Sequence, residues 1–192
     1  MRVNFLWILM LMQFHAAAQD VYVEAGKIIS IFDYTNSTGD EIELQKGIYN
    51  SIGLGFRGPF ESSGGRLYLN LGLSLNKYGA TGSDTVLANS YEWDVNYLGI
   101  NIGLEFDLLE FRAFQFYLKG EEEFDGVKVF LKGGGGINYS LKENVTVFAY
   151  YLVANNLFNI GSDKSDGEKL KILTHNINIG VFLHLQNHSR FR

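Results

Sequence analysis

Three stretches of the chain alternate regularly between apolar residues and small or polar ones. In residues 67–76 leucine occupies every second position, and Tyr, Asn, Gly and Ser fill the positions between. Residues 98–106 and 176–185 repeat the pattern with Leu, Ile, Val and Phe on the apolar side. Successive side chains of a β-strand point to opposite faces, so a period of two predicts strands with one apolar face each. No helical period of comparable length follows residue 20, and the chain beyond it is predicted to be all-β.

Two architectures explain such strands. A soluble sandwich buries the apolar face and leaves the polar face in water. A membrane barrel turns the apolar face to lipid and the polar face to its lumen. Here the polar face carries mostly Gly, Asn, Ser and Tyr and few Lys or Glu, which favours an enclosed face. A soluble exported barrel that binds an apolar ligand remains the alternative.

Counting the strands gives an even number, as single-chain outer-membrane barrels require. Longer or more polar connections alternate with shorter ones, which matches outer loops and periplasmic turns. The expected fold is an eight-stranded antiparallel up-and-down transmembrane β-barrel. Its weakest strand is 111–119, and the apolar parity of 91–106 changes near Tyr97 and Leu98, which predicts a bulge or a protruding upper half. The predicted strands are 20–33, 47–58, 66–77, 91–106, 111–119, 127–139, 144–155 and 170–186.

The N-terminus has the features of an export signal. Arg2 precedes the apolar run FLWILMLM at residues 5–12, and three alanines at 16–18 provide small residues for cleavage. The run is too short to cross a bilayer, which takes about 20 apolar residues. We therefore expect a signal peptide at residues 1–19 and a barrel domain at residues 20–192.

Composition narrows the function. The net charge of −5 argues against a nucleic-acid partner, and the absence of cysteine removes thiolate chemistry. The glycines at 133–136 lie inside a predicted strand, where a phosphate loop would not form. His175, His184 and His188 are scattered along one strand and the tail, so no catalytic set is recognisable. The sequence predicts no enzyme, no cofactor and no metal site, because the acidic loops lack the spacing of an EF-hand calcium site.

Two stretches carry a family resemblance: WDVNYLGINIGLE at 93–105 and KGGGGINY at 132–139, together with Gly26 and FDY at 32–34. In these the chain resembles the small outer-membrane β-barrel proteins common in Bacteroidota, related in architecture to barrels of the OmpA and OmpX type. The resemblance implies a bacterial outer-membrane location, contact with outer-membrane lipid and handling by the barrel-assembly machinery during insertion. One departure is that Phe191 is penultimate, whereas such barrels often end on an aromatic residue.

An eight-stranded barrel is just wide enough for side chains to fill it. The residues expected to point inward carry both charges, and charges held together away from water must pair. We therefore predict a salt-bridged plug in the lumen, the alternative being that some of these groups sit in water at the rims. The predicted network consists of Glu24, Arg57, Glu105, Lys128 and Lys132.

The predicted outer loops are acidic and are expected to offer a surface to an extracellular partner. Their acidic residues are Asp40, Glu41, Glu43, Asp84, Glu121, Glu122, Glu123, Asp125, Asp163, Asp166 and Glu168. Aromatic residues near the strand ends predict two interfacial girdles. The outer girdle contains Phe32, Tyr34, Tyr78, Tyr91 and Trp93, and the periplasmic girdle contains Tyr22, Phe56, Phe106, Phe111 and Tyr139. The expected role is structural or surface-interacting, and the alternatives are a narrow pore for small solutes or the soluble ligand carrier.

Overall fold

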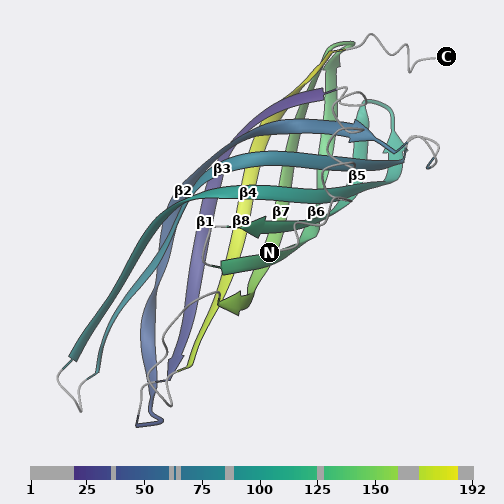
Figure 1. Ribbon diagram of the computed structural model, residues 1–192. Helices are drawn as coiled ribbons and strands as arrows, with labels where there is room; N and C mark the ends of the chain where they lie inside the picture. Colours follow the sequence, from purple (N-terminus) through teal and green to yellow (C-terminus); the bar gives the residue numbers. More distant parts are fainter. Residues whose placement is uncertain are drawn as a thin grey trace, which may run out of the picture.

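The computed structural model describes residues 20–35, 38–60, 63, 66–84, 89–124, 128–159 and 169–185. These residues form eight strands, each pairing antiparallel with the next, and β1 also pairs with β8, which closes the sheet into a barrel (Figure 1). The predicted fold is confirmed. The strands are β1 (Asp20–Thr35), β2 (Glu41–Pro59), β3 (Leu67–Asp84), β4 (Asn89–Phe111), β5 (Phe114–Phe124), β6 (Lys128–Lys142), β7 (Val145–Asn159) and β8 (Lys169–His184).

Two features predicted from the sequence lie near the ends of the chain. The predicted signal peptide and the penultimate Phe191 lie outside the described residues. Within the described ranges, no helix has the length and apolar character needed to cross a membrane.

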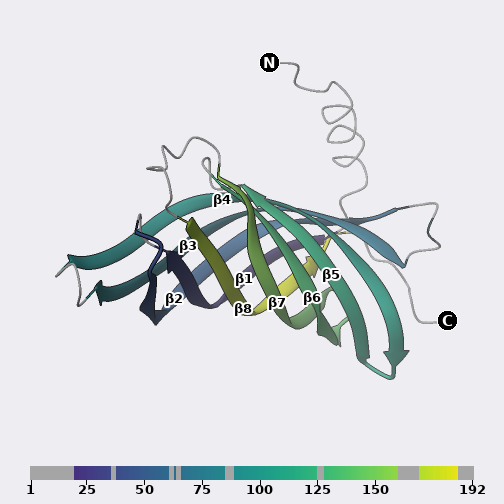
Figure 2. The same cartoon turned by 90° about the horizontal axis from the view of Figure 1, so that it is seen from below.

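The two ends of the barrel differ. At one end, here called the turn end, Asp20 pairs with His184, and two-residue turns join β4 to β5 and β6 to β7. At the other, here called the hairpin end, β3 and β4 stay paired as far as Asp84 and Asn89 (Figures 1 and 2). Short turns face the periplasm and longer extensions face outward in barrels of this kind. This assigns the turn end to the periplasmic side.

Several strands run further than the sequence pattern suggests. β2 begins at Glu41 and β3 ends at Asp84, so Glu41, Glu43 and Asp84 belong to strands and not to loops. The weakly predicted strand at 111–119 is β5 at 114–124, which takes in Glu121, Glu122 and Glu123. The prediction of an acidic third loop at these three residues was wrong. A run of acidic residues normally marks a solvated loop, but here Glu121 and Glu123 alternate inward on a strand.

An apolar belt surrounds the part of the barrel nearer the turn end. Its side chains point outward and are strongly exposed, although they are among the largest apolar residues of the chain. Large contiguous apolar surfaces of this kind mark contact with a partner or a membrane, and a closed barrel leaves no unpaired backbone toward lipid. The belt includes Val23, Ile52, Leu54, Phe56, Leu73, Leu75, Leu98, Ile100, Leu104, Phe106, Phe116, Leu118, Leu131, Tyr151, Ile177, Ile179 and Leu183.

Toward the hairpin end the pattern inverts. Outward positions become polar, as at Glu92, Asp94 and Asn96 of β4, while Trp93 and Val95 turn inward onto an apolar cluster. A tilted strand needs about 9–11 residues to cross a membrane, and β4 has 23. The upper part of β4 therefore resembles an ordinary water-soluble sheet. Of the two explanations predicted for the parity change near Tyr97 and Leu98, the protruding upper half is therefore correct. A bulge is not, because β3 and β4 pair through this point without a register shift.

Aromatic side chains that point into the lumen need space, and a glycine provides it where such a side chain lies close to the backbone of a neighbouring strand. A Cβ at Gly136 would collide with the Tyr117 hydroxyl and the Ala149 carbonyl, whereas a Cβ at Gly133 would meet nothing within 4 Å. Of these two glycines, Gly136 is therefore the one that close packing inside the barrel requires.

We expect Gly136→Ala to lower the free energy of unfolding by about 1–3 kcal/mol, the usual effect of overpacking. Gly133→Ala is the matched control in the same strand and should stay within about 0.5 kcal/mol of the parent. Equilibrium urea unfolding in lipid vesicles measures both. Equal losses in the two variants would show that the Tyr117 ring does not occupy the space beside Gly136.

Candidate functional site in the lumen

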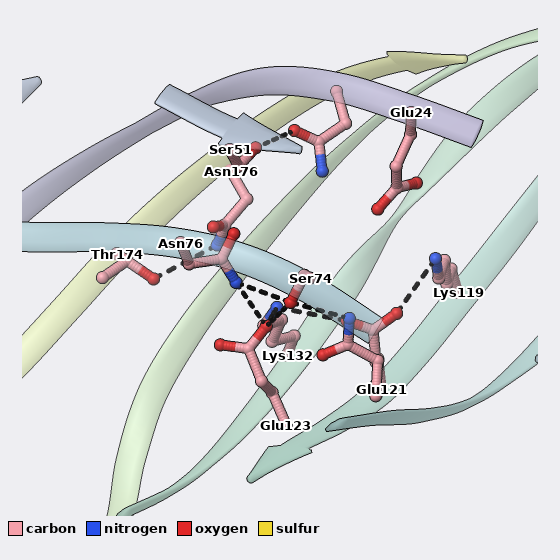
Figure 3. A network of polar contacts seen from close by, with 12 residues as sticks. Glu24, Ser51, Ser74, Asn76, Lys119, Glu121, Glu123, Lys132, Thr174 and Asn176 are labelled. Atoms are coloured by element: carbon pink, nitrogen blue, oxygen red, sulfur yellow. Dashed lines mark hydrogen bonds and ion pairs between the residues drawn. The ribbon is translucent and has the colours of Figure 1, made fainter. Parts of the chain in front are cut away.

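The centre of the lumen holds a line of alternating charges contributed by two neighbouring strands. Glu121 of β5 and Lys132 of β6 are paired residues, and Lys132 Nζ lies 3.1 Å from Glu121 Oε1. The same ammonium contacts Glu123 Oε2 at 2.5 Å, and Lys119 Nζ lies 3.0 Å from Glu121 Oε2. Figure 3 shows Lys132 between the two glutamates, with Lys119 beyond Glu121. All four side chains are buried, so each charge has its counter-charge within the barrel, as burial requires.

The Glu123 carboxylate also accepts hydrogen bonds from the two preceding strands, β3 and β4. Asn76 Nδ2 donates to Oε2 at 2.8 Å, the Ser74 hydroxyl donates to the same oxygen at 3.2 Å, and Tyr97 donates to Oε1. Ser74 in turn accepts from Asn101 Nδ2 at 3.0 Å. These bonds join β3 and β4 to β5, and together with the four charged groups they form what is here called the lumen network. Glu123 has no solvent-exposed surface.

Nearer the turn end, Arg57 forms a second ionic centre. Its Nη2 lies 3.1 Å from Glu105 Oε1, and its Nε lies 3.9 Å from Asp20 Oδ2. The guanidinium lies 3.8 Å from the centroid of the Tyr68 ring and 4.6 Å from that of Phe182. A planar cation can pair with carboxylates at its edge and stack on rings with its faces, which suits Arg better than Lys.

Hydrogen bonds also close the seam between the first and last strands. Asp20 Oδ1 lies 2.6 Å from His184 Nδ1, and His184 Nε2 lies 2.9 Å from the Thr146 hydroxyl. The three residues come from β1, β8 and β7. Their bonds link the first strand to the last two strands, at the seam where β1 meets β8.

Glu24 takes part through hydrogen bonds. Its Oε1 accepts from the Tyr150 hydroxyl at 2.8 Å, Tyr150 accepts from Asn178 at 2.6 Å, and Asn178 accepts from Ser51 at 2.9 Å. Its Oε2 has no hydrogen-bond partner within the described structure. Glu24 and Lys119 both line a cavity of about 10 Å³, which has room for about one water.

Apolar side chains fill the lumen on both sides of the lumen network. The lower cluster, nearer the turn end, consists of Tyr22, Tyr117, Phe148, Tyr150, Leu152 and Phe182. The upper cluster, nearer the hairpin end, consists of Phe32, Tyr78, Ala80, Phe130, Ala154 and Ile172, with Leu44, Trp93, Val95 and Tyr97 packed against it. The charged centre therefore lies between two plugs rich in aromatic rings.

The upper cluster corrects the predicted outer girdle. Phe32, Tyr34 and Tyr78 are buried inside the barrel, and the rings of Phe32 and Tyr78 are 6.0 Å apart. Tyr22, assigned to the periplasmic girdle, also points inward. On β1 the aromatic residues Tyr22, Phe32 and Tyr34 share the alternation that faces the lumen, and aliphatic residues such as Val23 lie on the outer face. By contrast, outward exposure is found for Phe56, Phe106, Phe111 and Tyr139, and the side chain of Tyr91 lies outside the described set.

Of the five residues predicted for the lumen charge network, the structure brings Arg57 and Glu105 into one ion pair. Lys132 lies in the lumen but pairs with Glu121 and Glu123, two residues predicted to lie in a loop. Glu24 is hydrogen-bonded to Tyr150. The side chain of Lys128 lies outside the described part of the structure.

Four charged residues of the lumen were not predicted from the sequence: Asp20, Lys119, Glu121 and Glu123. The last three share the parity of Tyr117, so extending that alternation by four residues would have placed them in the lumen. Asp20 had no such signal, because it lies at the first residue of the first strand. Among the described residues no group of three or more His, Cys, Asp or Glu is arranged to hold a metal ion.

At the hairpin end, β4 extends beyond its described pairing with β5. Its pairing with β5 begins at Ile100 and Phe124, and β5 goes no further. From Asn89 to Gly99, β4 pairs with β3 on one side, and no described strand lies on the other. Figure 1 shows β3 and β4 running well beyond the β5–β6 hairpin. The edge of a sheet is a surface on which an added strand can pair through its backbone.

Comparison with known proteins gives the fold. No family model matches the chain, and no curated protein matches it in sequence. Among solved structures, the crystal structure of Neisserial surface protein A is similar with a TM-score of 0.50 and 17% identity, over 85% of this chain and 96% of that one. The outer membrane protein OprG from Pseudomonas aeruginosa gives a TM-score of 0.49 and 16% identity, over 88% of this chain and 97% of that one. This fold and the apolar belt together indicate a β-barrel of the bacterial outer membrane.

Proposed function

We propose that the protein is an outer-membrane barrel closed to solutes, whose role is carried by the surface at its hairpin end. The observation that supports closure is the filling of the lumen at three levels: the lower cluster, the lumen network and the upper cluster. The cavity beside Glu24 is about 10 Å³, far less than a solute path needs. Side chains fill the interior of eight-stranded barrels in general.

The protruding β3–β4 hairpin is the part of this surface best suited to an external partner. Its outer face is polar at Glu92, Asp94 and Asn96, so it lies in water. The edge of β4 from Asp94 to Gly99, next to the point where its pairing with β5 stops, can accept an extended segment by strand addition. An acidic face favours a partner segment with basic residues, and it disfavours pairing with a second copy, which would bring like charges together.

Bilayer conductance tests closure. The parent barrel, reconstituted after its heat-modifiable migration has confirmed folding, should give no steady conductance. The double variant Tyr22→Ala, Tyr117→Ala removes two rings of the lower cluster and should admit ions if its barrel still folds. Large, steady openings of the parent would favour the alternative of a narrow pore and overturn the proposal.

Photo-crosslinking tests the surface role. A photoreactive residue placed at Asp94 and, in a second variant, at Asn96 should give the same adduct with the partner. Deleting residues of the hairpin between 80 and 93 should remove that adduct. The same group at Lys142, at the turn end, is the control. An adduct that forms equally from Lys142 would count against a role for the hairpin.

A further inference from the structure

The outer wall of the barrel is interrupted between β2 and β3. Lys46 pairs with Ala80 and Ser51 pairs with Asn76, but four β2 residues stand opposite three β3 residues between these pairs. β2 thus carries an extra residue here, a bulge that bends the strand. Ser30 of β1 reaches across β2, accepts a hydrogen bond from the Gly79 amide at 3.3 Å and donates one to the Gly79 carbonyl at 2.6 Å. Ser30 therefore satisfies backbone groups of β3 at the interruption.

A groove of about 720 Å³ lies at this interruption. A convex barrel wall does not normally form such a hollow, and the bulge in β2 explains it. The groove is lined by Ile48, Tyr49, Asn50, Ile52, Leu75, Asn76, Lys77, Asn96, Tyr97 and Leu98.

Six outward side chains of the groove lie in two rows, one apolar and one polar, and a seventh, Ile48, lies beyond the polar row toward the hairpin end. Ile52, Leu75 and Leu98 are cross-strand neighbours and form the last apolar row of the belt. One step toward the hairpin end lie Asn50, Lys77 and Asn96, with Lys77 directly opposite Asn96. The groove therefore straddles the border between the apolar belt and the polar upper zone. This is where a membrane lipid changes from acyl chain to headgroup.

The charges at the polar row favour an anionic headgroup. Lys77 lies in the row itself, and Lys27 of β1 donates to Asn50 Oδ1 at 2.6 Å. Lys77 Nζ lies 2.8 Å from Asp94 Oδ1, and both side chains are substantially exposed. An exposed pair of this kind is weak, so Lys77 can exchange Asp94 for a phosphate. Asparagine amides at 50 and 96 can donate to the remaining phosphate oxygens.

We propose that this groove binds one membrane lipid whose phosphate headgroup carries a net negative charge. Its acyl chain lies along Ile52, Leu75 and Leu98, and its phosphate lies between Lys77 and the amides of Asn50 and Asn96. The inference rests on the membrane placement of the belt and goes beyond the closed lumen and the hairpin surface.

The test is a native mass spectrometry titration of the folded barrel, in detergent, with dioleoylphosphatidylglycerol and with dioleoylphosphatidylcholine. The anionic lipid should bind more tightly. Lys77→Gln should weaken its binding about fivefold, since one Lys near an anionic surface is worth about 1 kcal/mol. Asp94→Asn should tighten binding, because it frees Lys77. Lys142→Gln, an exposed lysine at the turn end, should leave binding unchanged.

The opposite signs expected for Lys77→Gln and Asp94→Asn separate a headgroup site from lipid that coats any barrel. Equal binding of the two lipids, or no response to either variant, would overturn the proposal. Full displacement of the lipid by inorganic phosphate would overturn it too, because the site would then be an anion site without an acyl-chain contribution. None of these results bears on bilayer conductance, so the lipid site and the closed lumen fail or stand separately.

Discussion

Replacing Lys132 with methionine is expected to lower the free energy of unfolding by about 3–5 kcal/mol, as breaking a buried ion pair by removing one partner usually does. Lys132 is the cation that contacts both Glu121 and Glu123. Without it Glu121 keeps Lys119, but Glu123 is left as a fully buried carboxylate with no cation among its partners in the described structure. Methionine fills the space of the lysine stem, so the loss reflects charge more than volume.

A double variant separates the charge effect from packing. Lys132→Met combined with Glu123→Gln should recover more than half of the loss, because glutamine keeps an acceptor for Tyr97 and carries no charge. Lys142→Met changes an exposed lysine of the same strand and should alter stability by less than about 0.5 kcal/mol. Urea unfolding followed by the fluorescence of Trp93 measures all three. A single variant as stable as the control would mean that the lumen network does not hold buried charge.

Replacing Arg57 with methionine should also lower the free energy of unfolding by about 3–5 kcal/mol. The loss leaves Glu105 and Asp20 without the cation between them, and the Tyr68 and Phe182 rings lose a stacked guanidinium. Lysine at this position keeps the charge, but its ammonium cannot stack on the two rings and has no planar pair of N–H donors for the carboxylates. Arg57→Lys should therefore fall between the parent and Arg57→Met.

An exposed ion pair supplies the comparison. Lys77→Met breaks the contact with Asp94 in a water-facing position and should reduce stability by at most about 1 kcal/mol. Similar losses for Lys77→Met and Arg57→Met in the same urea titration would contradict the burial of Arg57. An Arg57→Lys variant no better than Arg57→Met would show that the charge itself contributes little.

The fold could be predicted from sequence because its determinant is local. A period of two in residues 67–76 and 98–106 sets which side chains face outward, and it does not depend on what any residue contacts. An even strand number and unequal connections then leave few topologies. The ends of the strands were harder to predict, because acidic residues at 121–123 fit a solvated loop as well as a charged lumen.

The lumen pairing could be predicted only in outline. That inward charges must pair follows from electrostatics, but which partner each takes depends on register between strands. Glu121 meets Lys132 because the β5–β6 hairpin sets those two opposite each other, and the sequence gives no turn signal that fixes this register. The groove beside Lys77 could not be predicted from the sequence either, because it depends on an extra residue in β2 that only the strand pairing reveals.

The inversion of the outer face along β4 is the central structural claim, because it sets where the membrane ends and where the water-exposed hairpin begins. The chain has no cysteine, so single cysteines can be placed at outward positions on both sides of the inversion. Asp94 lies on the polar side, and Leu98 and Leu104 lie in the belt. Labelling with a membrane-impermeant maleimide after reconstitution into vesicles should be fast at 94 and absent at 98 and 104. Unfolding should make all three positions reactive. Equal, fast labelling at all three in the folded barrel would contradict a membrane-spanning belt and would favour a soluble barrel.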